Sequence, residues 1–110
     1  MINNYKFNYN DKGCKKFFKI YNHNKKLIKK LIEEKLIQQM ITNFSKTKLA
    51  IHSEINKHKC YECRVNLHNI PDIRIAFTIN GNNITIQYIT TSISKEIFSK
   101  EFQKFVKEHY

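Results

Sequence analysis

The chain has 110 residues, enough for one domain with a single modest core and too few for two. It carries 20 Lys and Arg against 9 Asp and Glu, a formal charge of +11 at pH 7, and 41% of its residues are hydrophobic. This composition excludes a disordered chain, and a positive field of that size favours nucleic acid, an anionic membrane surface or an acidic protein as partner. A genome biased toward Lys, Asn and Ile would explain part of the charge, but not the low acidic count.

The first elements are a short strand and a helix. Aromatic and polar residues alternate over residues 4–9, which is typical of a strand. Asn10 or Asp11 can cap the following helix, in which apolar residues recur at helical spacing from Cys14 to Tyr21. Gly13 is expected to weaken this helix by about 1 kcal/mol relative to alanine.

A second, longer helix is predicted from about Lys25 to Phe44, after a short polar break. Its apolar residues keep a helical period, and Lys and Glu occupy the remaining positions. A short link between two amphipathic helices favours an antiparallel helical hairpin. We expect the apolar side of this hairpin to cover the sheet.

The stretch from Ser45 to Lys59 has mixed polarity and no clean period, so we expect a loop that could contain a short strand. Its lysines are candidate RNA-binding residues, because phosphate contacts position a nucleic acid without reading its sequence. These candidates are Lys46, Lys48, Lys57 and Lys59, and we expect His52 and His58 beside the same polar face of the sheet. The alternative is an ordinary solvated loop.

The run from His58 to Tyr88 predicts three consecutive antiparallel strands. Apolar and polar residues alternate from Tyr61 to His68 and again from Ile73 to Asn80, and residues 80–83 supply the Gly and Asn of a tight turn. The third strand is expected to place Ile84, Ile86 and Tyr88 on one face. The opposite, polar face then gathers four chemically active side chains, which are Glu62, Arg64, His68 and Arg74.

A C-terminal helix closes the predicted fold. Ser94 is its expected N-cap, and its buried stripe is expected to comprise Ile97, Phe98, Phe102, Phe105 and Val106. The whole chain, residues 1–110, is therefore predicted to be one α+β domain of order β-α-α-β-β-β-α, with one sheet packed against helices.

The three cysteines indicate reduced thiols in a soluble, cytoplasmic protein, because the sequence shows neither a secretion signal nor an apolar run that could span a membrane. Cys60 and Cys63 form a C-x-x-C pair near two histidines, which suggests zinc. Residues three apart in a strand point to opposite faces, however, so the two thiols cannot converge on one ion. We expect no metal, and we interpret Cys63 as a small hydrophobic core residue.

The order of elements, together with the segments KCYECRV, DIRIAFTI, NITIQYIT and IFSKEFQKFV, resembles the RelE/ParE superfamily of toxins from type II toxin–antitoxin systems. The resemblance implies a small cytoplasmic protein, without cofactor, small-molecule substrate or membrane, that a cognate antitoxin neutralises. RelE-like members cleave mRNA within the ribosome and so inhibit translation, whereas ParE-like members attack DNA gyrase.

The resemblance also implies roles for individual residues. Arg64 falls where a basic side chain of the family points at the RNA, and Arg74 matches an arginine that commonly precedes apolar strand residues. Glu62 lies where members carry either a base or an acid, and His68 lies in a linker that is longer than usual. Phe98 takes the position of a family tyrosine, where it could stack on a base but cannot transfer a proton.

The C-terminal region departs from the family pattern. The arginine expected after the last strand is missing from the segment Ser92, Ile93 and Ser94. The chain ends in His109 and Tyr110, a pair that in one branch directly follows the last strand. Here a helix intervenes, and we interpret the match as coincidental.

Cleavage of RNA through its 2′-OH needs a base, an acid and cations that stabilise the phosphorane. His68 could fill either proton-transfer role, Glu62 could be the base, and Arg64 and Arg74 could brace the phosphate. The alternative is structural: Glu62 and Arg64 would form a surface ion pair worth about 0 to 1 kcal/mol. Two functions therefore stand: an endoribonuclease, or a non-cleaving toxin or inactive relative that binds gyrase or RNA.

Overall fold

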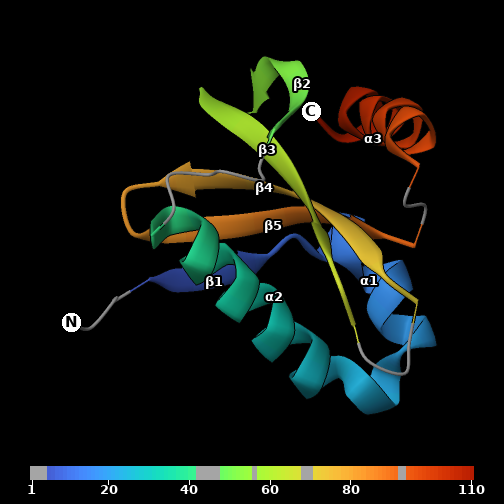
Figure 1. Cartoon of the computed structure of the whole chain (residues 1–110). Helices are drawn as coiled ribbons and strands as arrows, with labels where there is room; N and C mark the ends of the chain where they lie inside the picture. The colour runs from blue at the N-terminus through green and yellow to red at the C-terminus, as the bar shows by residue number, and fades with distance from the viewer. Residues whose placement is uncertain (1–4, 42–47, 56, 68–70, 92–93) are drawn as a thin grey trace.

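A computed structural model describes residues 5–41, 48–55, 57–67, 71–91 and 94–110; of residues 48 and 51–53 it describes the backbone alone. Within these ranges the chain is α+β, with three α-helices and a five-stranded mixed sheet (Figure 1). The elements are β1 Lys6–Tyr9, α1 Asp11–Ile20, the 3₁₀ turn η1 Asn22–Asn24, α2 Lys25–Ile41, β2 Lys48–Ile55, β3 His58–Val65, β4 Ile73–Asn80, β5 Asn83–Thr90 and α3 Lys95–His109. The strand order is β1-β5-β4-β3-β2, with β1 parallel to β5 and the other neighbours antiparallel.

Strand β2 confirms the possible strand before residue 59, but it has 8 residues and adds a strand to the predicted sheet. It forms the edge of the sheet beside β3, so the order of elements is β-α-α-β-β-β-β-α. Its register with β3 shifts between Leu49 and Glu54. Ala50 and Ile55, five residues apart, are consequently both buried in the same cluster. A regular strand would place them on opposite faces, which is why the sequence shows no alternation here.

Helices α1 and α2 cover one face of the sheet, as predicted. Cys14, Phe17 and Phe18 of α1 and Ile28, Ile32 and Leu36 of α2 are buried in one cluster with apolar strand residues. These strand residues include Cys63, Val65, Ile73, Ile75, Phe77, Ile84 and Ile86. Removing this apolar surface from water is the main force that holds the helices on the sheet.

Helix α3 packs on the opposite face, where the sequence predicted only polar side chains (Figure 1). Phe98, Phe102 and Phe105 are buried with Cys60 and Ala76 and with Ala50 and Ile55 of β2. Ile97, predicted to be buried, is 56% exposed because it lies one position before this aromatic stripe. Both faces of the sheet therefore carry a core.

A β-bulge in β5 re-aims one side chain. Ala76 pairs with Tyr88 and Phe77 with Ile86. Gln87, between these two residues of β5, is therefore an extra residue that has no partner in β4. The bulge places Tyr88 against the α3 cluster, whereas regular alternation predicted it beside Ile84 and Ile86. Gln87 itself is buried on the α3 side.

Local signals were read correctly at the helix starts and at the β4–β5 turn. Asn10 Oδ1 accepts a hydrogen bond from the Lys12 amide at 3.0 Å, and Ser94 Oγ accepts one from the Ile97 amide at 3.5 Å. Gly81 has φ 60°, the left-handed conformation that a two-residue hairpin turn demands. None of the helices in the described part of the chain combines the length and apolar character needed to cross a membrane.

The three thiols are buried on two faces of the sheet. Cys14 and Cys63 lie in the cluster under α1 and α2, whereas Cys60 lies in the α3 cluster, which confirms that the C-x-x-C pair is split. Desolvation by burial raises the pKa of each thiol to about 12. Iodoacetamide at pH 8 should therefore leave all three unmodified in the native protein and label all three in urea, because a thiol with that pKa is about one part in ten thousand thiolate.

Mass spectrometry of the alkylated protein measures this directly. A free-cysteine peptide in the same tube gives the reference rate, and we expect the native protein to react at least about a hundredfold more slowly. Labelling of Cys60 at the peptide's rate would contradict the packing of α3 on the sheet.

Candidate functional site

Two of the predicted catalytic residues form a partly buried ion pair. Arg74 Nη1 donates to Glu62 Oε2 at 2.9 Å, and the side chains are 16% and 4% exposed. They come from neighbouring positions of β3 and β4, since Glu62 stands opposite Ala76 and Arg64 opposite Arg74. The sequence-based alternative paired Glu62 with Arg64 on an exposed face. The structure corrects both the partner of Glu62, which is Arg74, and the exposure of the pair, which is lower than expected.

Arg64 is held by a different carboxylate. Its Nη2 donates to Asp72 Oδ2 at 2.8 Å, and its side chain is 48% exposed. Asp72 Oδ1 also accepts from the Leu67 amide at 3.2 Å, and the hydrogen bond from Arg64 is the main cause that lowers the pKa of this carboxyl. Arg64 lines a shallow cleft with Lys35, Asn66 and Asp72, apart from the Glu62 pair.

The structure describes the remaining predicted residues only in part. His68 and Lys46 lie outside the described residues, and Lys48 stands opposite Glu62 in β2 by its backbone. Lys57 and Lys59 are exposed on either side of His58. Phe98 is fully buried under α3, because its ring fills the aromatic stripe, so the expectation that it stacks on a base is corrected to a core role.

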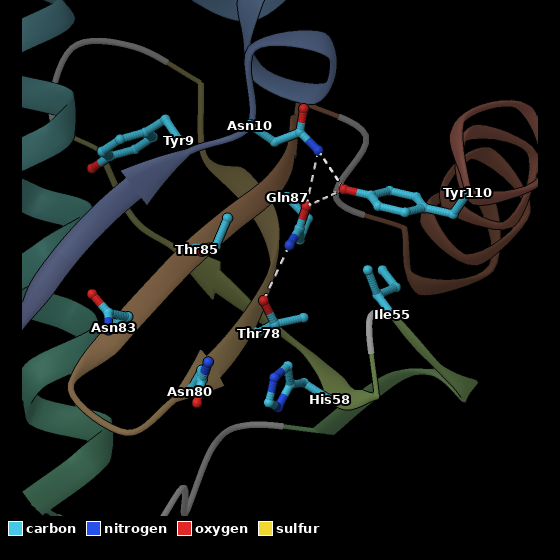
Figure 2. A pocket seen from close by; sticks show the side chains of 10 residues that line it. All are labelled: Tyr9, Asn10, Ile55, His58, Thr78, Asn80, Asn83, Thr85, Gln87 and Tyr110. Carbon is cyan, nitrogen blue, oxygen red and sulfur yellow. Dashed lines mark hydrogen bonds between the residues drawn. The ribbon is translucent and has the colours of Figure 1, made fainter.

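A polar pocket on the α3 side of the sheet was not predicted from the sequence (Figure 2). Its volume is about 410 Å³. Its wall is formed by the end of strand β1 and the residue after it, the β2–β3 hairpin, strands β4 and β5, and Tyr110. The lining residues are Tyr9, Asn10, Ile55, His58, Thr78, Asn80, Asn83, Thr85, Gln87 and Tyr110. We call it the His58 pocket.

The bulge residue Gln87 organises one end of this pocket (Figure 2). Its Nε2 donates to Thr78 Oγ1 at 3.1 Å, and its Oε1 accepts from Asn10 Nδ2 at 2.9 Å and from the Tyr110 hydroxyl at 2.7 Å. Asn10 Nδ2 also donates to the Tyr110 hydroxyl oxygen at 2.7 Å. The C-terminal tyrosine is thus fixed to the start of α1, although 100 residues separate them in the sequence.

His58 lies at the other end of the pocket, where Asn80 also lies (Figure 2). It is the first residue of β3, it stands opposite Ile55 of β2, and its side chain is half-buried. The preceding Lys57 has φ 69°, a left-handed conformation suited to a tight hairpin. The hairpin therefore carries an imidazole into the pocket, which neither of the two neighbouring lysines lines.

The His58 pocket offers groups for proton transfer and for holding an anion. Histidine can accept or donate a proton near neutral pH. Burial raises the pKa of the Tyr110 phenol, and its hydroxyl donates a hydrogen bond to Gln87 Oε1. Within the described ranges, no cluster of three or more His, Cys, Asp or Glu side chains could hold a metal ion.

Comparisons with known proteins do not assign the chain to a family. No family model, curated protein or solved structure shows significant similarity to it.

Proposed function

We propose that this protein is a toxin of the RelE/ParE type that cleaves RNA through the ribose 2′-OH, with the His58 pocket as its reaction centre. The observation that carries the proposal is the imidazole in a polar pocket that Tyr110 also lines, on a chain of charge +11. The order of a strand, two helices, antiparallel strands and a final helix supports the RelE-like fold, with β2 as an added edge strand.

The pocket suggests how the reaction would proceed. His58 would take the proton of the 2′-OH, whose oxygen attacks the phosphorus, and Tyr110 would give a proton to the 5′-oxygen as its bond to phosphorus breaks. The pocket amides would stabilise charge on the phosphorane. The products would be a 2′,3′-cyclic phosphate and a 5′-hydroxyl end.

The proposal includes the partners that the resemblance implies. The substrate would be mRNA, presented by the ribosome or free in the cytoplasm, and the inhibitor would be an antitoxin protein. An acidic antitoxin segment suits this chain, because complementary charge speeds association and disfavours wrong partners.

A non-cleaving function is the second candidate, and the Glu62–Arg74 pair favours it. Both groups were expected to do chemistry, yet they neutralise each other almost out of contact with water. In this reading the protein binds RNA or a protein target such as gyrase without cleavage.

Inducible expression in a bacterial host, with mapping of mRNA 5′ ends shortly after induction, tests the proposal. We expect new ends inside translated frames with the unsubstituted protein. We expect His58→Ala to lower their number by about a hundredfold or more, because loss of a general base typically costs that factor.

Arg64→Ala is the matched control, because it removes an exposed cation outside the His58 pocket. It should reduce cleavage by less than about tenfold. Cleavage that survives His58→Ala but disappears in Arg64→Ala would move the reaction centre to the β3–β4 arginines. Growth arrest without new ends would favour the non-cleaving candidate.

A further inference from the structure

A second cleft, of about 370 Å³, lies between α1 and α2 on the other side of edge strand β1. Four lysines line it, Lys15 and Lys19 from α1 and Lys25 and Lys29 from α2, and we call it the lysine cleft. In the described part of the chain, no carboxylate forms an ion pair with any of these four ammonium groups. Asp11 is the one acidic residue among those that line the cleft.

Aromatic rings hold two of the lysines in place. Lys29 Nζ lies 4.6 Å from the centroid of the Tyr9 ring and 5.5 Å from that of Phe18, and Lys25 Nζ lies 5.5 Å from the Phe18 centroid. Such cation–π contacts fix the position of a charge without neutralising it. Because Phe18 is 7% exposed and already covered, its ring is not offered to a nucleic-acid base.

A second acid, Glu33, accepts a hydrogen bond from the Tyr9 hydroxyl at 2.8 Å and forms no ion pair with the cleft lysines in the described part of the chain. On each helix the two cleft lysines are four residues apart, which places them about 6 Å apart along the axis. Two short rows of unpaired cations thus face each other across the cleft.

Tyr9 joins this cleft to the reaction centre, because it lines both the lysine cleft and the His58 pocket. We propose that the lysine cleft binds backbone phosphates of the RNA strand whose reacting bond lies in the His58 pocket, the strand crossing β1 at Tyr9. This inference rests on RNA being the ligand of the proposed function. The cleft favours phosphates over an amphipathic peptide, because the apolar side chains that line it, Cys14 and Phe18, are buried.

The test measures binding of a fluorescent, single-stranded 15-nucleotide RNA by anisotropy, with 2′-O-methyl groups so that cleavage cannot interfere. The variant Lys15→Gln/Lys19→Gln/Lys25→Gln keeps Lys29, which packs on Tyr9, and lowers the charge by three. The control Lys95→Gln/Lys104→Gln/Lys107→Gln removes the same charge from exposed positions of α3. Circular dichroism checks that both variants are folded.

We expect the cleft variant to lose at least about tenfold in affinity and the α3 variant less than about threefold. The slope of log K against log[salt] should fall by about 2 in the cleft variant alone, because each phosphate contact to a single strand contributes about 0.7. Equal losses in the two variants would overturn the inference and leave the His58 chemistry standing. Normal cleavage by His58→Ala would overturn that chemistry and leave the cleft standing. If the protein bound oligo-glutamate and did not bind the RNA, both the phosphate-binding role of the cleft and the RNA chemistry at His58 would be overturned.

Discussion

Gly13→Ala should lower the free energy of unfolding by about 3 kcal/mol or more, although alanine is the better helix former by about 1 kcal/mol. Gly13 is a buried position of α1 that lies directly on the bulge of β5. A Cβ atom there would overlap the carbonyl oxygen of Gln87 and lie 2.9 Å from its carbonyl carbon and 3.1 Å from Phe105 Cζ. Backbone atoms cannot move aside as a flexible side chain would, so the helix must separate from the sheet.

The measurement is thermal and urea unfolding, and a loss of that size corresponds to a drop of about 12 °C or more in Tm. Lys16→Ala is the matched control, because it changes an exposed residue of the same helix and should stay within about 0.5 kcal/mol. Gly81→Ala should lose about 1 kcal/mol, from its φ of 60° rather than from contact, since nothing lies within 4 Å of its Cβ position. Equal stability of Gly13→Ala and Lys16→Ala would contradict the close approach of α1 to β5.

Features set by neighbours in the sequence could be predicted. The two N-caps depend on a side chain and an amide two or three residues away, and both were read correctly. The apolar alternation of β3 and β4 and the helical periods of α1 and α2 placed one core on the correct face of the sheet. These signals are local, so one sequence suffices to read them.

Features set by distant contacts could not be predicted. The bulge at Gln87 depends on how β5 pairs with β4, and the buried face under α3 depends on where a helix docks after the last strand. The His58 pocket needs both, together with the return of Tyr110 to Asn10. The RNA-binding and antitoxin roles stay predictions.

The partly buried ion pair permits a strong test of whether Arg74 acts in structure or in chemistry. Arg74→Met should lower the free energy of unfolding by about 3 kcal/mol, because it leaves the Glu62 carboxylate, 4% exposed, without its ionic partner. Arg64→Ala removes a cation that is 48% exposed and should change stability by less than about 1 kcal/mol. Urea unfolding at neutral pH distinguishes the two.

A second substitution separates the burial of charge from the loss of contacts. Glu62→Gln in the Arg74→Met background should restore part of the lost stability, because a neutral amide costs less than an unpaired carboxylate to bury. If the pair is structural, the double variant should cleave RNA within about tenfold of the unsubstituted protein at a temperature where both are folded. A double variant that is stable but inactive would instead place the reaction at Glu62 and Arg74. Loss of toxicity in Arg74→Met alone cannot decide this, because unfolding abolishes toxicity as surely as the loss of a catalytic group does.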